Sequence, residues 1–358
     1  MDIFAEMERH GHEQVVFCYD KATGLKMVVG IHSTALGPAL GGCRMWRYEK
    51  DDDAVQDVLR LSEGMTYKNA AMGLDLGGGK TVVIAAPDAD RAALFEAVGR
   101  FIESLGGRYV TAEDVGTTTE DMAVVARQTS YVRGLKGKSG DPSAATSVGV
   151  FVSIEAALKE AFGSGEISGR TFAVQGLGHV GRYLVDQLTA EGGQVVVTDI
   201  DPAKVQAVLQ NPNVSAVEPD AIYDVVGAAF VPCALGAILN DRTIPRLRVK
   251  VVAGSANNQL AEPRHGAMLA ERGILYAPDF IVNGGGVINV ADEMNPGGYN
   301  KERAAIRVLG IRQRLEEIFR LSREGHMLPV EAANHLAEER IQREGHSGIY
   351  LAHPAKTS

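Results

Sequence analysis

A glycine-rich turn in the second half of the chain constrains the fold more than any other feature. Residues 171–175 form an apolar run typical of a buried strand, and Gly176-Leu177-Gly178-His179-Val180-Gly181 follow it directly. A helical pattern then extends through Leu188, and a second apolar run ends at Asp199, 23 positions after the first glycine. This order of strand, glycine loop, helix, strand and acid predicts a Rossmann unit, although the glycine motif alone would be weak evidence. A purely structural glycine-rich turn is the alternative.

The same segment predicts a dinucleotide cofactor. Its glycines let the backbone approach a pyrophosphate, and the helix that follows supplies amides and the positive end of its dipole. Asp199 is expected to bind ribose hydroxyls and, with Asp201, to repel a 2′-phosphate, which favours NAD over NADP. Strands expected at 225–230 and 249–254 end in small or amide residues, which suit a ligand-facing sheet edge. The expected cofactor-binding set is Gly176, Leu177, Gly178, His179, Val180, Gly181, Asp199, Cys233, Ala234 and Asn257.

Histidines and cysteines attract functional interpretations that the sequence does not favour. His179 lies inside the glycine motif, where a catalytic histidine would be badly placed, so an exposed position is expected. Cys233 has no histidine or arginine nearby in sequence, which favours a small buried wall over a nucleophile. His10 and His12 lack metal-ligand spacing and are expected on a polar N-terminal face. No metal site is predicted.

The segment 65–80 is the second informative stretch. It holds Lys68 and Lys80, 12 residues apart, and three consecutive glycines precede the second lysine. Such glycines indicate a close backbone approach, so the lysine is expected to be aimed by a loop; a surface turn with a solvated lysine is the alternative. Aspartates at 51–53 are expected to begin the helix that delivers Lys68, and residues 81–84 are expected to form a buried strand.

The rest of the N-terminal region alternates strands and helices. Residues 14–19 and 26–31 predict a hairpin, and residues 36–44 a glycine-rich loop. A helix over 88–105 and a strand over 108–111 follow, and Asp114 lies just beyond that strand. Such alternation predicts a mostly parallel sheet whose carboxyl edge holds the ligand, which is where Asp114 falls.

Length and composition limit the remaining possibilities. The 358 residues predict two domains, with expected ranges 1–143 and 144–325 and a helical C-terminal segment 326–358 that returns to the first domain. A net charge of −9 argues against nucleic-acid binding, and three scattered cysteines suit a reducing cytoplasm. The longest uncharged apolar run, 15 residues broken by glycine and proline, is too short for a membrane span. We therefore expect a cytoplasmic protein with neither nucleic-acid nor membrane partners.

Residues 300–342 are expected to be helical, and an apolar stripe along them is expected to form core and interface. The stripe consists of Ile306, Leu309, Ile311, Leu315, Ile318 and Phe319. Residues 343–358 lack periodicity and are interpreted as an arm to a neighbouring subunit.

Taken together, the motifs resemble those of the Glu/Leu/Phe/Val amino acid dehydrogenases over nearly the whole chain. The motifs that carry the resemblance are residues 37–42, 65–80, 111–117, 176–181, 256–260 and 289–293. Within the family the chain looks most like leucine dehydrogenases, with valine dehydrogenases close behind. The resemblance implies an α/β protein whose N-terminal substrate domain and Rossmann domain flank an active-site cleft. It also implies NAD-dependent oxidative deamination of an L-amino acid to a 2-oxo acid and ammonia, and a homo-oligomer, either dimer or octamer.

The resemblance also assigns roles to residues. It implies that Lys68, helped by Asn258, binds the substrate carboxylate, that Lys80 is the catalytic lysine, and that Asp114 relays a proton at the amine. Lys80, kept neutral by the nearby Lys68 and a dry cleft, would deprotonate the water that attacks an iminium.

Substrate class follows from one position of the motif. Glutamate dehydrogenases of the superfamily carry a lysine where this chain has Leu40, so a glutamate side chain would lack a partner here. The expected aliphatic pocket comprises Leu40, Gly41, Ala112, Val287 and Val290, which favours leucine, valine and isoleucine. The alternatives are a phenylalanine or tryptophan dehydrogenase and a catalytically silent NAD-binding regulatory subunit. Departures from the family pattern at Ser255, Gly284 and residues 136–138 affect none of the proposed catalytic residues.

Overall fold

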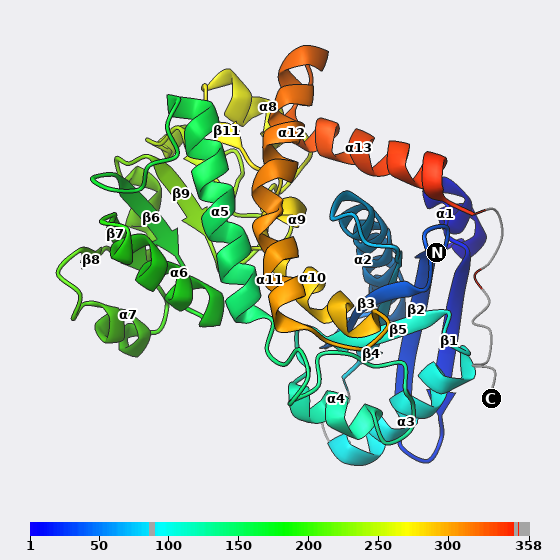
Figure 1. Ribbon diagram of the computed structural model, residues 1–358. Helices are drawn as coiled ribbons and strands as arrows, with labels where there is room; N and C mark the ends of the chain where they lie inside the picture. Colours follow the sequence, from blue (N-terminus) through cyan, green and yellow to red (C-terminus); the bar gives the residue numbers. More distant parts are fainter. Residues whose placement is uncertain (86–89, 347–349, 351–358) are drawn as a thin grey trace. The chain divides into compact units, whose positions relative to one another are not determined.

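The computed structural model describes residues 1–85, 90–346 and 350, which divide between two units, each built around its own β-sheet (Figure 1). The first unit comprises residues 1–141, 290–300 and 337–358 of the chain, and the second comprises 142–289 and 301–336. The expected ranges differ from this division at three places: the first boundary falls after residue 141 rather than 143, residues 290–300 group with the first unit, and residues 326–336 group with the second.

The first unit contains a five-stranded sheet in the order β1-β2-β4-β3-β5. Its strands are β1 (Gln14–Asp20), β2 (Leu25–Ser33), β3 (Ala39–Trp46), β4 (Gly77–Ile84) and β5 (Tyr109–Glu113). Its helices are α1 (Ile3–His10), α2 (Asp51–Ala71), α3 (Arg91–Ser104) and α4 (Thr119–Val125), with the short 3-10 helix η3 (Asp292–Met294). β2 is antiparallel to both of its neighbours, while β3 is parallel to β4 and β5, so four of the five strands run the same way. The predicted hairpin and the mostly parallel sheet are confirmed.

Two segments that were expected to be glycine-rich loops are strands. The expected loop 36–44 becomes β3 from Ala39 onward, and the three glycines before Lys80 begin β4. A Cβ atom on Gly78 would lie 2.1 Å from the backbone N of Thr66 in α2. A Cβ on Gly79 would lie 2.6 Å from the ring of Tyr109 in β5. These glycines therefore allow close packing against the sheet rather than a turn, and the prediction of a loop was wrong.

Apolar side chains fill both faces of this sheet. One cluster packs α2 on one face and consists of Val28, Ala54, Val55, Val58, Leu59 and Val82. The other face is covered by α3 and α4, through residues that include Val83, Leu94, Phe95, Val98, Ile102, Tyr109, Met122 and Val125. The predicted helix start near Asp88 falls at residues 86–89, outside the described part; the described helix begins at Arg91, where the Asp90 carboxylate accepts hydrogen bonds from two backbone amides.

Later parts of the chain complete the first unit. Glu293 Oε1 accepts hydrogen bonds from the backbone amides of Gly134, at 3.1 Å, and Ser139, at 3.0 Å. Arg340 Nη1 donates to the carbonyl of Leu74 at 2.6 Å. The backbone N of Tyr350 donates to Thr34 Oγ1 at 3.0 Å. The expected intersubunit arm otherwise lies largely outside the described residues.

The second unit contains a six-stranded, fully parallel sheet in the order β11-β10-β9-β6-β7-β8. Its strands are β6 (Thr171–Gln175), β7 (Gln194–Thr198), β8 (Val214–Ala216), β9 (Ala229–Pro232), β10 (Val251–Val252) and β11 (Leu275–Tyr276). Its helices are α5 (Ser143–Phe162), α6 (His179–Ala190), α7 (Pro202–Val208), η1 (Pro219–Asp224), η2 (Ile244–Arg246), α8 (Arg264–Glu271), α9 (Asp279–Val282), α10 (Gly285–Ala291), α11 (Lys301–Leu309) and α12 (Ile311–Gly325). Helix α13 (Pro329–Glu344) belongs to this unit up to Leu336 and to the first unit beyond it. The strand order reverses between β6 and β9, which is the switch point of a Rossmann fold.

Several expected boundaries in this unit shift. β9 begins at Ala229 rather than 225, because Val226 forms only an isolated bridge to Arg248 and the chain bends at residues 227–228. The strand expected at 249–254 is only two residues long. Ile306 and Leu309 are 71% and 51% exposed, so they lie outside the core of this chain, and a place at an interface stays a prediction. The buried face of α11 is formed instead by Ala304 and Val308.

The expectation that His12 lies on a polar face was also wrong. Its side chain is buried, its Nε2 lies 3.0 Å from both the Leu59 carbonyl and Ser62 Oγ, and its ring packs edge-on against His32. None of the helices within the described residues combines the length and the apolar character that crossing a membrane requires.

Candidate active site

The two predicted catalytic residues meet on one face of the first sheet, where β5 ends. Lys80 lies on β4, and Asp114 directly follows β5. Lys80 Nζ lies 3.0 Å from Asp114 Oδ2, and the Lys80 residue is only 5% exposed. The alternative of a solvated surface lysine is therefore wrong.

Strand register explains how these side chains come together. β3 lies between β4 and β5, and Gly42 of β3 is paired with Ala112 of β5. The offset of 38 residues between β3 and β4 sets Gly42 opposite Lys80 on the other side. A Cβ on Gly42 would lie 2.6 Å from the Cβ of Asp114, so only glycine leaves the room that the Lys80–Asp114 contact occupies.

The electrostatics of Asp114 favour its charged form. Burial raises the pKa of this carboxyl, but the opposite charges and hydrogen bonds of Lys80 and Arg44 outweigh burial and hold the pKa below its usual range. Arg44 Nε donates to Asp114 Oδ2 at 3.1 Å. Asp114 is thus a carboxylate at neutral pH.

Helix α2 delivers Lys68, as predicted, in its last turn. The next residue, Asn69, is fully buried and donates from Nδ2 to the carbonyl of Gly77 at 2.6 Å and to that of Leu40 at 3.4 Å. These bonds tie the end of α2 to β3 and β4 at the level of the glycines. The backbone that carries Lys68 is therefore fixed against the strands that carry Lys80 and Leu40.

The expected pocket residues divide between the units. Leu40, which is 1% exposed, lies on the same face of the sheet as Gly42, since the two positions alternate with Gly41. Gly41 contributes its backbone, and its carbonyl accepts a hydrogen bond from the Tyr109 hydroxyl at 2.9 Å. Residues Ala112 and Val290 belong to the first unit and Val287 to the second.

The glycine motif of the second unit forms the cradle that the sequence predicts. Gly176 has a φ of +97°, and a Cβ there would lie 2.8 Å from the Cβ of Ala234. A Cβ on Gly181 would lie 2.0 Å from the Gly176 carbonyl oxygen. The chain at 233–234 therefore packs directly against this loop, which supports the expected place of Cys233 and Ala234 beside the cofactor. These residues fit a bound pyrophosphate, because the loop has backbone space and leads into α6.

The acid at the end of β7 is held in place before any ligand binds. Asp199 Oδ2 accepts a hydrogen bond from the Leu177 amide at 2.6 Å, and Oδ1 accepts one from the Asp201 amide at 2.9 Å. Asp201 itself caps α7 by accepting from the Ala203 amide. The carboxylate of Asp199 therefore sits beside the glycine loop, as a ribose-binding acid should.

The amide residues after β10 lie in a strained loop. Asn257 Oδ1 accepts from Asn283 Nδ2 at 2.7 Å. Asn258 has a φ of +51°, in the left-handed region, and its carbonyl accepts from the Ala237 amide at 2.7 Å. Strain of this kind persists only where the surroundings fix it, which is common at ligand-binding sites. His179 is exposed, as expected, and burial raises the pKa of the Cys233 thiol, which fits a wall residue better than a nucleophile.

One cluster of possible metal ligands occurs among the described residues, Asp241, Glu262 and His265. The Arg264 guanidinium already pairs with both carboxylates. This cluster carries its own countercharge and lies outside the predicted sites.

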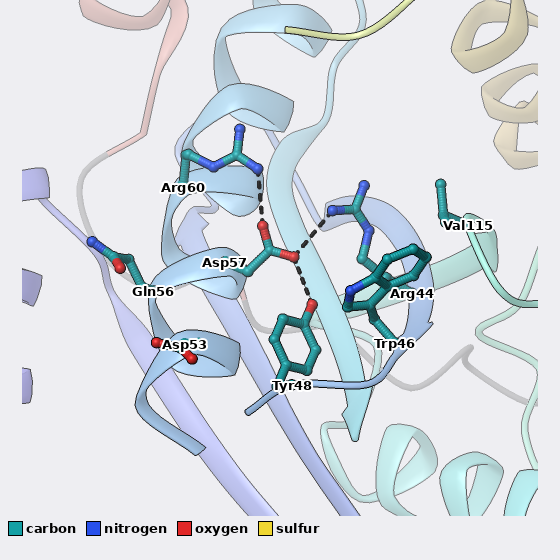
Figure 2. A pocket seen from close by; sticks show the side chains of 8 residues that line it. All are labelled: Arg44, Trp46, Tyr48, Asp53, Gln56, Asp57, Arg60 and Val115. Atoms are coloured by element: carbon teal, nitrogen blue, oxygen red, sulfur yellow. Dashed lines mark hydrogen bonds and ion pairs between the residues drawn. The ribbon is translucent and has the colours of Figure 1, made fainter. Parts of the chain in front are cut away.

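The residue that sequence reasoning missed is Arg44, which ion-pairs with both Asp114 and Asp57. The signal was the alternation Leu40, Gly42, Arg44, which places all three positions on one strand face; the expectation of a loop over 36–44 obscured it. Figure 2 shows Arg44 at the wall of a pocket on the first unit.

Comparison with known proteins agrees with this geometry. Residues 12–131 match the family model "Glu/Leu/Phe/Val dehydrogenase, dimerisation domain", and residues 137–205 and 203–345 match "Glutamate/Leucine/Phenylalanine/Valine dehydrogenase". The chain is 53% identical to leucine dehydrogenase of Thermoactinomyces intermedius, over 96% of this chain and 94% of that protein. It is 47% identical to phenylalanine dehydrogenase of Lysinibacillus sphaericus, over 95% and 91% of the two chains.

A solved structure gives the same result. The crystal structure of L-tryptophan dehydrogenase from Nostoc punctiforme superimposes with a TM-score of 0.84 at 42% identity, covering 95% of this chain and 99% of that one. The buried Lys80–Asp114 pair, the glycine loop of the second unit, the matching family models and these relatives lead to one conclusion. The chain belongs to the Glu/Leu/Phe/Val dehydrogenase family and is an amino acid dehydrogenase.

Proposed function

We propose that the protein catalyses the reversible, NAD-dependent oxidative deamination of branched-chain L-amino acids to 2-oxo acids, ammonia and NADH. The observation that carries the proposal is the buried Lys80–Asp114 pair beside Leu40 on one sheet face. The leucine dehydrogenases among the relatives support the choice of substrate.

The proposed chemistry uses each charged residue once. Lys68 and the side-chain amide of Asn258 bind the substrate carboxylate. Bound NAD would supply the acceptor for the hydride that leaves the α-carbon. Asp114, 3.0 Å away, first takes up the proton of the Lys80 ammonium, which leaves Lys80 as a neutral amine. Lys80 then takes a proton from the water that attacks the resulting iminium, and Asp114 passes its proton to the departing ammonia. Because the pKa of Asp114 is lowered, its protonated form is a strong acid and gives up that proton readily.

Substrate choice rests on Leu40. A fully buried aliphatic residue cannot stabilise the side-chain carboxylate of glutamate, and desolvating that charge without a partner is costly. Branched aliphatic side chains differ by single methylene groups, which such a pocket separates by only about 1–3 kcal/mol. We therefore expect leucine, isoleucine and valine all to be substrates.

The choice of NAD rests on Asp199. Its carboxylate, held by the Leu177 and Asp201 amides, would bind the ribose hydroxyls and repel a 2′-phosphate. D199A should weaken NAD binding and reduce the preference for NAD over NADP, measured as the ratio of kcat/KM. D201A is the matched control: it should lower the melting temperature through loss of the α7 cap while changing the ratio less.

We propose that the homo-oligomer forms at β1, one of the two edge strands of the first sheet. Phe17 and Tyr19 point to one side of this strand and are 55% and 63% exposed. Paired apolar edges are a common route to dimers, and the family model over this region is described as a dimerisation domain. Sedimentation of the double variant F17E/Y19E should show a smaller species than the unchanged protein; an unchanged mass would place the interface elsewhere.

The experiment that tests the activity is NADH formation at alkaline pH with leucine, isoleucine, valine, phenylalanine, tryptophan and glutamate offered separately. Turnover of the three aliphatic substrates, with little for glutamate, is the expected result. Preference for an aromatic substrate would agree with the proposed deamination but contradict the proposed aliphatic pocket around Leu40. Silence with all six, in folded protein that binds NADH, would reject the function in favour of a regulatory subunit.

A further inference from the structure

Arg44 joins the proposed proton relay to a second carboxylate that has no part in it. Its Nε donates to Asp114 Oδ2 at 3.1 Å, and its Nη1 donates to Asp57 Oδ2 at 3.0 Å. The side chains of Arg44 and Asp57 are only 17% and 16% exposed. A planar guanidinium held at two points has little rotational freedom, so the direction of its bond to Asp114 is fixed.

Three side chains bind the Asp57 carboxylate, as Figure 2 shows. Tyr48 donates its hydroxyl to Asp57 Oδ2 at 2.6 Å, and Arg60 Nη2 donates to Oδ1 at 2.9 Å. Burial raises the pKa of Asp57, but these hydrogen bonds and the charge of Arg44 lower it below its usual range. Asp57 is therefore a fixed anion that anchors Arg44 from helix α2.

The sheet explains why Arg44 reaches Asp114. β3 and β5 are paired up to Cys43 and Glu113, so the next residues along, Arg44 and Asp114, also face each other. Arg44 Nε and Lys80 Nζ both contact the same oxygen, Oδ2 of Asp114. Among the described residues Oδ1 makes no such contact, which leaves that oxygen directed away from both cations.

We propose that Arg44 is a positioning residue that fixes the charge and orientation of the Asp114 carboxylate next to Lys80, and that Asp57 and Tyr48 hold Arg44 for this task. The proposal rests on the proposed role of Asp114 as proton relay. With Arg44 in place, one oxygen of Asp114 contacts Lys80 while the other is presented to the substrate amine. Without Arg44, the Asp114 carboxylate can rotate away from Lys80, and one cation fewer stabilises its negative charge.

The first test is the pH profile of kcat/KM for R44A, whose acid limb reports ionisation of free enzyme groups. We expect kcat to fall roughly 10- to 100-fold, as misplaced catalytic groups do, and the acid limb to move to higher pH. The pocket of about 510 Å³ beside Arg44 offers a route for a small cation, so millimolar guanidinium should restore part of kcat in R44A. An unmoved acid limb without rescue would show that Arg44 is merely structural and overturn the proposal.

A second variant keeps the test valid if R44A does not fold. R44K retains a cation that can reach one carboxylate but not both, so its acid limb should stay near that of the unchanged enzyme while kcat falls. D57N keeps an acceptor for Arg44 but removes a negative charge, so the acid limb of its pH profile should not move to higher pH. If R44K or D57N moved the limb upward as far as R44A, charge placement by Arg44 would be rejected.

Controls separate this inference from the proposed function. R246M removes an arginine that also bridges two carboxylates, Asp220 and Asp224, but lies in the second unit, and it should leave the pH profile unchanged. NADH binding should be equal in all folded variants. If D114N turned over leucine normally, the relay itself would fail; if D114N were inactive while R44A kept its kcat and pH profile, only the positioning role would fail.

Discussion

A Cβ atom on Gly42 would lie 2.6 Å from the Cβ of Asp114. No pair of non-bonded carbons tolerates that distance, so the presence of glycine on β3 is a condition for the contact between Asp114 and Lys80. The proposed chemistry of the site therefore depends on a glycine at this position of β3.

Substituting this glycine should therefore damage catalysis. In G42A, Asp114 has to move away from β3, and we expect kcat to fall by about 100-fold, as for a misplacement on the order of 1 Å. The melting temperature should also fall. G64A provides the contrast, because a Cβ at this exposed position of α2 would meet nothing within 4 Å. Alanine there should stabilise the protein by up to about 1 kcal/mol with unchanged kcat.

The catalytic lysine can be tested with an apolar replacement of similar length. K80M should lower kcat by roughly 100- to 10,000-fold, the usual contribution of one acid–base group. NADH binding, measured by fluorescence titration, should be unaffected, since its proposed residues belong to the second unit. K26M, which changes an exposed lysine of the same sheet, should behave as the unchanged protein. Normal turnover by K80M would remove Lys80 from the mechanism.

A lysine at position 40 should alter substrate choice. L40K places an ammonium where Leu40 is now 1% exposed, so the variant should lose leucine activity and gain activity with glutamate, whose side-chain carboxylate would pair with it. Unpaired, the buried ammonium should lower the melting temperature, and added glutamate should raise it again. L40M tests whether shape alone matters. It should retain leucine turnover, and a gain of glutamate activity in L40M would contradict the charge argument.

Acid should destabilise the protein through His12. Burial, reinforced by the neighbouring His32, lowers the pKa of His12 to about 4 in the folded state, against about 6.5 when unfolded. Between these values the unfolded chain binds the extra proton, so the free energy of unfolding decreases as pH falls from about 6.5 towards 4. The slope contributed by this group approaches about 1.4 kcal/mol per pH unit.

Thermal unfolding between pH 7 and pH 4.5 would measure this effect. H12Q should show a flatter dependence of melting temperature on pH than the unchanged protein. H346Q, at an exposed histidine, should show the same dependence as the unchanged protein. If the melting temperatures of H12Q, H346Q and the unchanged protein depended on pH in the same way, the acid destabilisation would arise at groups other than His12.

Much of the fold follows from local patterns in the sequence. The Rossmann unit could be predicted because its strand, glycine loop, helix and acid are contiguous between residues 171 and 199. The hairpin and the position of Asp114 after a strand were equally local. The glycine-containing strands β3 and β4 could not be recognised, because glycine by itself disfavours strands. Only close packing selects it: the β4 glycines pack against Thr66 and Tyr109, and Gly42 of β3 packs against Asp114.

The site was predictable only in part for a related reason. Lys80 and Asp114 could be named from their motifs, but their partners Arg44 and Asp57 are set by strand register and by the docking of α2. Neither relationship is visible in a linear sequence. The burial of His12 was missed likewise, because it depends on α2 residues Leu59 and Ser62, 47 and 50 positions away.

The discontinuity of the first unit affects the order in which the chain can mature. The backbone amides of Gly134 and Ser139 need Glu293 as their acceptor, and the carbonyl of Leu74 after α2 needs Arg340 as its donor. These hydrogen bonds of the first unit therefore involve residues that are made late in synthesis. The second unit likewise takes in α11, α12 and the start of α13, which follow Glu293 in the chain, so neither unit is complete before these late residues are made. A nascent chain released before α13 would thus leave both units unfinished, and enzymatic activity would mark chains that extend through this helix.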